Sequence, residues 1–448
     1  MSYVTKGLVI VQKQHRRQNK QHKRKKQKLQ SEQRKPQREK QRNEVNKGDR
    51  KSDPPLNAEE ISVEKIRLKK KETSPRRSFV GRVLAAIFGA ASFFFAWLKM
   101  KETSSMKTKE FVETGKDAVE NEFSLGLHFP VQDPFLFCAH HLDDYPRGDD
   151  SEATSADLTG RNMGSDFDLK DGFRMYHGEK VPGFPVHPHR GFETVTIVRR
   201  GVVDHADSLG AAGRYGAGDV QWMTAGSGVQ HSEMFPLVNQ DEKNPLELFQ
   251  VWLNLPAANK FTKPDFKMFW SEHIPVVEND QVALEVISGN FEGVRGLQAP
   301  SASWASQKDS DLVIAILTLK QAGKFTLFSA ELGLTRFLYF YEGKSALVGG
   351  GGVSSGTGFQ LNSSESLSLE NKDKEPAKFL LLQGRPIGEP VFQHGPFVMN
   401  TKEEVIQAFR DYRATEFGGW PWPRRDMVHG SQSGRFAKFP NGKKEFPG

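Results

Sequence analysis

Cysteine is nearly absent from this chain of 448 residues, which contains a single one, Cys138. One cysteine excludes an intrachain disulfide framework and any zinc site built from several cysteines. We therefore expect a folded part that needs no oxidising compartment. A lone cysteine can serve as a nucleophile, but a small buried apolar residue is the commoner role, and we expect that role here.

Acidic residues are fewer than basic residues in the N-terminal 120 residues, and basic residues are fewer than acidic residues in the rest of the chain. The formal net charge of +8 divides into +17 for residues 1–120 and −9 for residues 121–448. The charge of the whole chain therefore does not indicate nucleic-acid binding by the part that is long enough to fold, because that part is acidic. Residues 121–448 suffice for two domains of ordinary size.

Apolar residues are almost missing from residues 11–51, which consist mainly of Lys, Arg, Gln, Asn and His. Such a segment cannot bury enough apolar surface to offset the entropy of chain ordering. We therefore expect residues 1–78 to form a disordered basic extension. Two interpretations stay open: an arm for nuclear import or polyanion binding, with Lys23 to Lys26 at its centre, or a solvated tail.

A stretch without charge follows at residues 83–98, and extending it back to Phe79 gives twenty residues that include Arg82. As a helix, twenty residues match the hydrocarbon core of a bilayer, about 30 Å thick. Residues 79–98 are thus a candidate membrane anchor, with a hydrophobic hairpin or a partner-binding helix as alternatives. Residues 99–122 read as a polar linker. We expect an intracellular protein, membrane-anchored if residues 79–98 span, and otherwise nuclear or cytoplasmic.

Short apolar runs separated by Gly, Pro, Asn and Asp begin at Phe123 and are typical of an all-β fold. β-branched and aromatic residues dominate these runs, as strands prefer. They fall into two sets, which we interpret as two β-barrels in tandem. The clearest strands are predicted at 193–198, 219–224, 246–253 and 282–287 in the first set, and at 312–319, 324–328, 335–341 and 378–382 in the second.

One helix is predicted near the end of the chain. Thr401 and Glu404 form a capping-box pattern, and Val405, Phe409 and Tyr412 recur behind them at helical spacing. This apolar stripe would lie on a barrel. A run of four glycines at 349–352 lacks the Lys-Ser/Thr and the helix of a phosphate loop, so we expect a flexible hairpin loop there.

Histidine is absent between His273 and His394 and is concentrated in the first strand set. His187 and His189 form an H-x-H pair, and His231 and Glu233 form an H-x-E pair. On a strand, side chains at i and i+2 project from one face, so each pair would deliver two ligands to one point. Adjacent strands, about 5 Å apart, can bring both pairs around one metal ion.

The residues alone leave two questions about this site open. Three imidazoles and one carboxylate suit Fe(II), Mn(II), Cu(II), Ni(II) or Zn(II). Glu193 is an even number of residues from His187 and His189, so on one regular strand it would project from the same face. It therefore competes with Glu233 as the carboxylate ligand. His205 and Asp207 form a further pair on one face, which a hydrogen bond between strand edges would also explain.

Several long motifs resemble the pirin family of the cupin superfamily. They read GFPVHPHRGFETV at 183–195, GDVQWMTAGSGVQHSEM at 218–234 and EPVFQHGPFVMN at 389–400. The resemblance covers about residues 121–425. It implies a bicupin of two antiparallel, jelly-roll-type β-barrels packed face to face, with a C-terminal helix. The implied division is a metal-binding cupin at 123–290, a cupin without metal at 291–430 and a tail at 431–448.

The resemblance also implies a site and a function. One Fe(2+) would be held by His187, His189, His231 and Glu233, with Glu193 nearby. The implied activity is that of a quercetin 2,3-dioxygenase, with a flavonol-like substrate, O₂ and either Glu193 or Glu233 taking the substrate proton. The alternative is a redox-sensitive transcription cofactor that binds a protein partner such as a transcription factor. We expect the folded body to be monomeric.

The chain departs from the family near the start of the first barrel. Many pirins read Leu-Leu-Phe-Asp there, whereas this chain has FCAHHL at 137–142. Extra polar groups are therefore expected along the approach to the site. The substrate preference of other pirins does not carry over.

Overall fold

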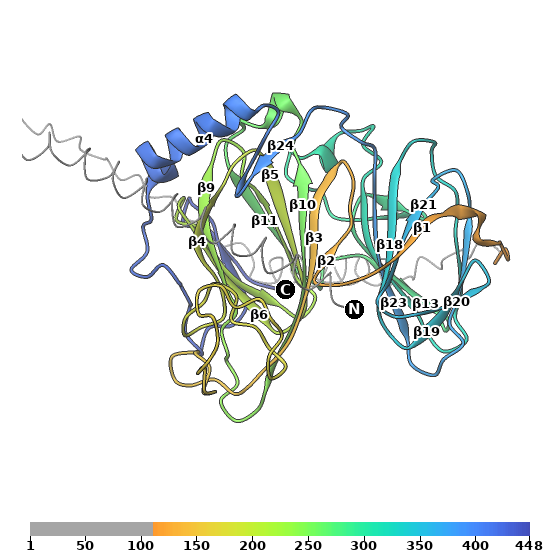
Figure 1. Ribbon diagram of the computed structural model, residues 1–448, viewed down its shortest axis with the longest axis horizontal. Helices are drawn as coiled ribbons and strands as arrows, with labels where there is room; N and C mark the ends of the chain where they lie inside the picture. The colour runs from red at the N-terminus through yellow and green to blue at the C-terminus, as the bar shows by residue number, and fades with distance from the viewer. Residues whose placement is uncertain (1–110) are drawn as a thin grey trace, which may run out of the picture. The chain divides into compact units, whose positions relative to one another are not determined.

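The computed structural model describes residues 111–448 (Figure 1). The basic extension at 1–78, the candidate anchor at 79–98 and the first half of the linker at 99–122 lie outside the described residues. Within residues 111–448, no helix combines the length and the apolar character needed to cross a bilayer.

The first barrel consists of two six-stranded antiparallel sheets in the described part of the chain. Their strand orders are β11-β8-β5-β10-β3-β2 and β27-β26-β7-β6-β9-β4. The strands are β2 (His128–Phe129), β3 (Phe135–Tyr145), β4 (Gly183–His189), β5 (Phe192–Arg200), β6 (Val202–Asp207), β7 (Ala212–Gly216), β8 (Val220–Thr224), β9 (Val229–Met234), β10 (Asn244–Asn254), β11 (Asp265–Phe269), β26 (Phe436–Lys438) and β27 (Lys444–Glu445).

The second barrel combines a seven-stranded sheet with a four-stranded one among residues 111–448. Their orders are β1-β21-β18-β23-β16-β13-β12 and β17-β22-β19-β20. The strands are β1 (Val119–Ser124), β12 (Val276–Glu278), β13 (Val282–Ser288), β16 (Val313–Leu319), β17 (Lys324–Leu327), β18 (Thr335–Glu342), β19 (Ser345–Val348), β20 (Gly351–Ser354), β21 (Thr357–Leu361), β22 (Leu367–Glu370) and β23 (Ala377–Gly384).

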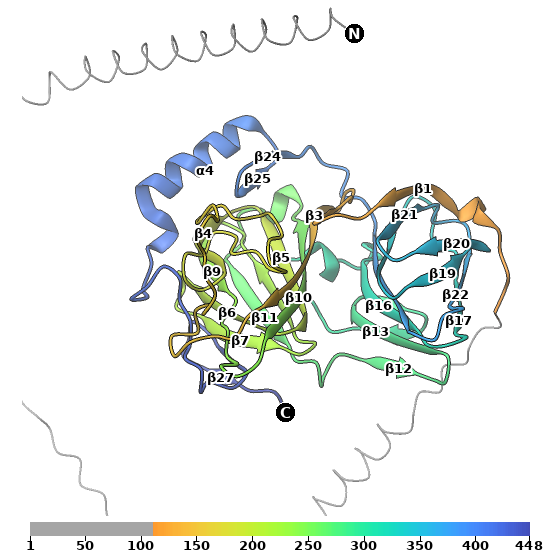
Figure 2. The same ribbon diagram turned by 60° about the horizontal axis from the view of Figure 1, so that its bottom comes forward.

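Short hairpins, 3-10 turns and one α-helix connect and cover the barrels within the described residues. Figure 2 shows α4 and its hairpin, β24 and β25, beside the strands of the first barrel. The elements are β14 (Asn290–Phe291), β15 (Val294–Arg295), β24 (Phe392–His394), β25 (Phe397–Met399), α4 (Lys402–Thr415), η1 (Lys116–Ala118), η2 (Ala257–Asn259), η3 (Trp304–Ser306) and η4 (Glu416–Gly418).

An apolar core joins the two barrels face to face. Val195, Ile197 and Phe249 of the first barrel are buried in one cluster with Ile314 and Leu380 of the second. Burying each such side chain contributes roughly 1.5–3 kcal/mol relative to leaving it exposed. The predicted all-β bicupin of two packed barrels is thereby confirmed.

Cys138 lies in the same inter-barrel core and is fully buried. Burial also raises the pKa of its thiol well above the usual range. Cys138 therefore packs as a small apolar residue, as expected, and is no nucleophile.

Strands and terminal segments are distributed between the barrels in a way that corrects the expected division of the chain. β12 and β13 fall within 123–290 but pair with the second barrel, where β13 joins β16. β1 overlaps the expected linker and pairs with β21 of the second barrel. At the other end, β26 of the expected tail pairs with β7 of the first barrel. Strand composition does not specify these partners, because the pairing is between residues far apart in sequence.

The predicted helix forms as α4, and its capping box is present. Thr401 Oγ1 accepts a hydrogen bond from the backbone N–H of Glu404, and the Glu404 carboxylate accepts one from the backbone N–H of Thr401. Val405 is buried, and Phe409 and Tyr412 pack beside it in a small core with β25. This core fixes the helix to the hairpin that borders the first barrel.

The glycine run at 349–352 forms the predicted hairpin, as a tight turn between β19 and β20, and is not a phosphate loop. Val348 pairs directly with Gly351. The two residues between them, Gly349 and Gly350, have φ values of 55° and 75°. Two-residue hairpin turns favour glycine at such positions because a Cβ atom is strained there.

Candidate metal centre

Three histidines converge inside the first barrel from two adjacent strands. His187 on β4 lies directly opposite His231 on β9, and His189 follows on the same face of β4. One ring nitrogen from each of the three histidines lies within 4.8 Å of the others. This spacing suits one ion, since N and O ligands lie at about 2.0–2.2 Å from a bound transition metal.

The protonation state of these imidazoles fits metal binding. Burial lowers the pKa of His187 to about 4 and holds the pKa values of His189 and His231 well below the usual range. All three rings are therefore neutral at physiological pH. A metal needs the neutral imidazole, which offers a free nitrogen lone pair.

Hydrogen bonds orient two of the rings and leave the third without a partner. Nδ1 of His187 lies 2.9 Å from the carbonyl oxygen of Pro185, and Nδ1 of His189 lies 3.4 Å from that of Pro396. Metal-ligating histidines commonly use their second nitrogen in this way. Neither buried nitrogen of His231 has a hydrogen-bond partner among the described residues. A metal ion would satisfy one of them.

Glu233 lies beside the three histidines on β9. Its Oε2 atom is 3.7 Å from Nε2 of His231. Thr196 Oγ1 donates to Oε1 over 2.9 Å, and Gln250 Nε2 donates to Oε2 over 3.0 Å. Burial raises the pKa of Glu233, and the two hydrogen bonds and His205 act against this rise. The structure therefore brings together all four residues predicted as ligands.

Glu193 is placed away from this group, which corrects the expectation that it competes for or borders the site. Its carboxylate accepts hydrogen bonds from Thr224 Oγ1 at 2.6 Å and Ser303 Oγ at 2.5 Å. It points to the opposite face of β5 from Thr196. The parity argument required one continuous strand, but the chain turns at Gly191, where φ is 86°, before β5 begins.

The buried Glu193 carboxylate gives a testable dependence of stability on pH. Burial raises the pKa of Glu193 from 4.5 to about 7 in the folded protein. Its contribution to stability is therefore complete below pH 4.5 and is lost as the pH rises through 7. We expect Glu193→Gln, which stays neutral, to match the wild type at pH 4.5 and to be more stable at pH 8 by about 1–3 kcal/mol.

Denaturant unfolding at both pH values measures this difference. Glu285→Gln offers a control, because Glu285 is paired with Arg199 at 2.9 Å on another strand and its loss should not flatten the pH profile. Equal stabilities of Glu193→Gln and the wild type at pH 8 would contradict the prediction.

The second predicted pair, His205 and Asp207, is explained by a hydrogen bond. His205 Nε2 lies 3.3 Å from Asp207 Oδ2, and both side chains are buried. Asp207 Oδ1 also accepts from the backbone N–H groups of Leu209 and Ala211. The pair therefore stabilises the turn after β6, beside the candidate metal centre.

A small cavity of about 120 Å³ opens onto the candidate centre. Its polar lining includes Thr196, Gln250 and His128, which the sequence interpretation missed, and His141, which belongs to the FCAHHL stretch expected along the approach. Alternation along β5 and β10 could have identified the first two. The remaining lining residues are Leu127, Phe137, Ala139, Phe167, Phe184, His187, His189, Glu233, Phe235, Leu248 and Trp252.

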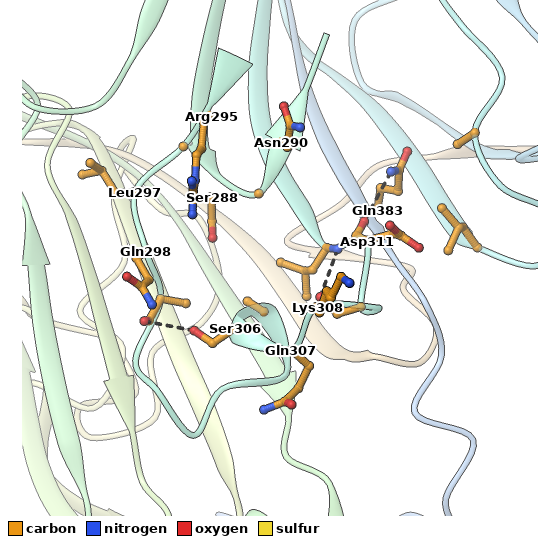
Figure 3. Close-up of a pocket in the computed structure, with 18 of the residues that line it drawn as sticks. Ser288, Asn290, Arg295, Leu297, Gln298, Ser306, Gln307, Lys308, Asp311 and Gln383 are labelled. Atoms are coloured by element: carbon orange, nitrogen blue, oxygen red, sulfur yellow. Dashed lines mark hydrogen bonds between the residues drawn. The ribbon is translucent and has the colours of Figure 1, made fainter. Parts of the chain in front are cut away.

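A larger cavity of about 530 Å³ lies elsewhere, along the segment between β13 and β16 of the second barrel (Figure 3). Polar side chains such as Arg295, Lys308 and Gln383 line it. None of the four predicted metal ligands contributes to its wall. It is thus a separate feature from the candidate centre.

The interior of the second barrel contrasts with that of the first. Its buried cluster consists of apolar side chains, among them Leu284, Leu317, Phe340, Leu369 and Phe379. These side chains fill the space where the first barrel holds its histidines. Within the described residues, the candidate metal-binding group is therefore a feature of the first barrel.

Fold and site together define a bicupin with three convergent histidines, a candidate metal centre, in its first barrel. Two family models match the chain: Pirin over residues 149–253 and the Pirin C-terminal cupin domain over residues 314–418. A pirin-like protein of Solanum lycopersicum is 38% identical over 240 residues, which cover 53% of this chain and 77% of that protein. The chain belongs to the pirin family.

Two further similarities bear on the activity. A protein of Pseudomonas aeruginosa, named for a proposed quercetin 2,3-dioxygenase activity, is 38% identical over 52% of this chain and 79% of its own length. The crystal structure of a quercetin 2,3-dioxygenase from Acinetobacter baumannii superposes with a TM-score of 0.51 at 28% identity. The match covers 70% of this chain and 99% of that one.

Proposed function

We propose that this protein is a mononuclear, iron-dependent dioxygenase of the quercetin 2,3-dioxygenase type. The observation that carries the proposal is the group of three neutral imidazoles, two buried and one half-buried, beside a buried carboxylate at a cavity with aromatic walls. The similarity to the enzyme from A. baumannii supports the substrate class. Fe(2+) suits three imidazoles and one carboxylate, although other divalent transition metals suit them too.

His187, His189, His231 and Glu233 would hold the metal. When bound, a transition metal supplies a Lewis acid that polarises a substrate oxygen and the redox chemistry that O₂ requires. The histidines contribute fixed nitrogen donors, because carbonyl groups of Pro185 and Pro396 orient two of the three rings. The chain thus provides the ligand set before any metal arrives.

Glu233 is suited to take a proton from a substrate hydroxyl group. Burial raises its pKa, which strengthens it as a base relative to an exposed carboxylate. Thr196 and Gln250 each donate a hydrogen bond to one of its oxygens and hold the carboxylate in place. This role passes to Glu233 because Glu193 does not line the cavity.

Aromatic side chains shape the cavity for a flat ring system. Phe137 and Trp252 lie 5.0 Å apart between ring centroids on one side, and Phe184 and Phe235 lie 6.0 Å apart on another. A volume of about 120 Å³ is below the roughly 300 Å³ at which pockets for drug-sized ligands begin. We therefore expect the wall to open on binding, at Phe167, which is 38% exposed.

Turnover of quercetin by the iron-loaded protein tests this function. We expect the absorption band of quercetin to decay in air, with uptake of O₂ and release of carbon monoxide, and no decay in an anaerobic sample. If protein fully loaded with Fe(II) turns over no flavonol, the proposal fails. That outcome would favour the alternative, a redox-sensitive transcription cofactor that binds a protein partner.

A further inference from the structure

His141 lies in the wall of this cavity, and one nitrogen of its buried imidazole lacks a hydrogen-bond partner. It lies on β3, is 5% exposed, and its Nδ1 atom makes no hydrogen bond with any described residue. The rings around it are those of Tyr176, Phe184 and Phe235, with centroids 4.9, 5.8 and 6.3 Å away. A buried polar group without a partner is costly, so its presence beside a cavity needs an explanation.

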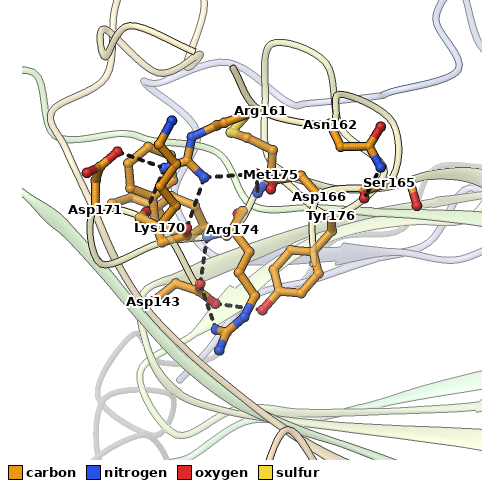
Figure 4. A network of polar contacts seen from close by, with 12 residues as sticks. Asp143, Arg161, Asn162, Ser165, Asp166, Lys170, Asp171, Arg174, Met175 and Tyr176 are labelled. Carbon is orange, nitrogen blue, oxygen red and sulfur yellow. Dashed lines mark hydrogen bonds and ion pairs between the residues drawn. The ribbon is translucent and has the colours of Figure 1, made fainter. Parts of the chain in front are cut away.

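The neighbouring polar groups are committed elsewhere, as Figure 4 shows. Asp143, two residues further along the same face of β3, accepts the hydroxyl hydrogen bond of Tyr176 at 2.7 Å. It also accepts from the backbone N–H and the guanidinium of Arg174 at 2.9 and 3.1 Å. Because Tyr176 donates to Asp143, the ring next to His141 does not donate its hydroxyl hydrogen to the imidazole.

The adjacent histidine shows that the unpaired state is particular to the cavity side of β3. His140 points to the other face, where its Nε2 atom lies 3.0 Å from Oε1 of Glu247. Its ring also stacks on Phe249, with centroids 4.5 Å apart. The two consecutive histidines therefore differ in their hydrogen bonding. His140 has a partner within the protein, whereas His141 faces the space that a substrate would occupy.

The chemistry of His141 limits what it can bind. Burial, together with the positive charge of Arg174 and two nearby histidines, lowers its pKa to about 3. A neutral imidazole presents one N–H donor and one acceptor, which match a neutral hydroxyl group. The aromatic surroundings favour a flat ring that carries this hydroxyl.

We propose that His141 is a specificity-determining residue that forms a hydrogen bond with a peripheral hydroxyl group of a polyphenolic substrate. The proposal rests on the proposed function for the substrate class but concerns binding rather than turnover. It predicts that the site distinguishes flavonols by hydroxyl groups other than the one that reacts. A site with an unpaired polar group rejects an analogue that cannot satisfy it.

Two ligands and two variants test this proposal. Quercetin and 3-hydroxyflavone share the reacting part, but 3-hydroxyflavone lacks the other hydroxyl groups. We expect the anaerobic, metal-loaded wild type to bind quercetin about tenfold more tightly by calorimetry. In His141→Phe the ratio of affinities should fall close to one. In the matched control His140→Phe, on the opposite face of the same strand, it should stay as in the wild type.

The thermal midpoint of each variant provides a second readout. Because Nδ1 of His141 has no partner to lose, the unliganded His141→Phe protein should melt at or above the wild-type temperature. His140→Phe should melt below it, since it loses the hydrogen bond to Glu247. A lower midpoint for His141→Phe than for His140→Phe would contradict the unpaired state of His141.

The outcomes separate this proposal from the proposed function. An unchanged affinity ratio in His141→Phe overturns the role of His141, even if quercetin is turned over. If the affinity ratio falls to about one in His141→Phe while the metal-loaded wild type turns over no flavonol, the role of His141 is supported and the proposed dioxygenase activity is contradicted. Failure of the metal-loaded wild type to bind either flavonol overturns both.

Discussion

Alanine at both His187 and His231 is expected to abolish metal retention by the purified protein. The two residues face each other across β4 and β9, and their loss leaves one imidazole and one carboxylate of the predicted set. Removing a group that merely orients a ligand typically lowers metal affinity about 10–100-fold. Removing two ligands should exceed that range. Elemental analysis should find about one iron per wild-type chain and almost none in the variant.

A control variant distinguishes ligands from other histidines of the cavity. His128 lines the cavity but is exposed and lies outside the three-histidine group, so His128→Ala should keep its metal. Iron retained in a one-to-one ratio by the double variant would contradict the metal centre. Circular dichroism should show unchanged β-structure in both proteins.

Glu233→Ala is expected to reduce flavonol turnover by about 10²–10⁴-fold, the usual contribution of a positioned general base. The variant removes the buried carboxylate that lies beside His231 and would accept the substrate proton. The initial rate of O₂ uptake at saturating quercetin measures the effect. Metal content must be measured in the same samples, because Glu233 is also a predicted ligand.

Thr196→Val serves as the graded comparison for this variant. It removes one of the two hydrogen bonds that hold the Glu233 carboxylate but keeps the carboxylate itself. Its turnover should fall less than that of Glu233→Ala. A Glu233→Ala protein that retains metal and works within tenfold of the wild-type rate would show that another group takes the proton.

The local features of the fold were predictable because they depend on neighbouring residues. Alternating apolar runs indicated strands such as β5, β10 and β16, and the capping box located the start of α4. The H-x-H and H-x-E pairs were predictable for the same reason. Each pair lies within one strand, so a period of two residues already places its members on one face.

Relations between distant segments were not predictable in this way. Glu193 was misplaced because the alternation of side chains along one strand was assumed to continue across the turn at Gly191. The pairing of β13 with β16, and of β26 with β7, depends on contacts that no local pattern encodes. The composition and spacing of apolar residues indicate that a segment forms a strand, but they do not indicate which strand it pairs with.

The positions of Thr196, Gln250 and His141 show an intermediate case. Thr196 and Gln250 lie on predicted strands, and His141 lies in the stretch where the chain departs from the family, yet the role of each follows from what lies opposite it. Thr196 and Gln250 meet Glu233 because β5 and β10 are neighbours in one sheet that faces β9 across the barrel. Side-chain chemistry alone does not provide that arrangement.

The return of the C-terminal segment to the first barrel has a consequence for biosynthesis. The carbonyl of Pro396 that lies near His189, and strand β26 that extends the sheet at β7, follow the strands of the second barrel in the chain and are translated after them. The first barrel therefore cannot acquire its complete wall while the ribosome is still making the second. The four predicted ligands all precede these segments in the chain, so the ligand set can assemble before the wall beside it is complete.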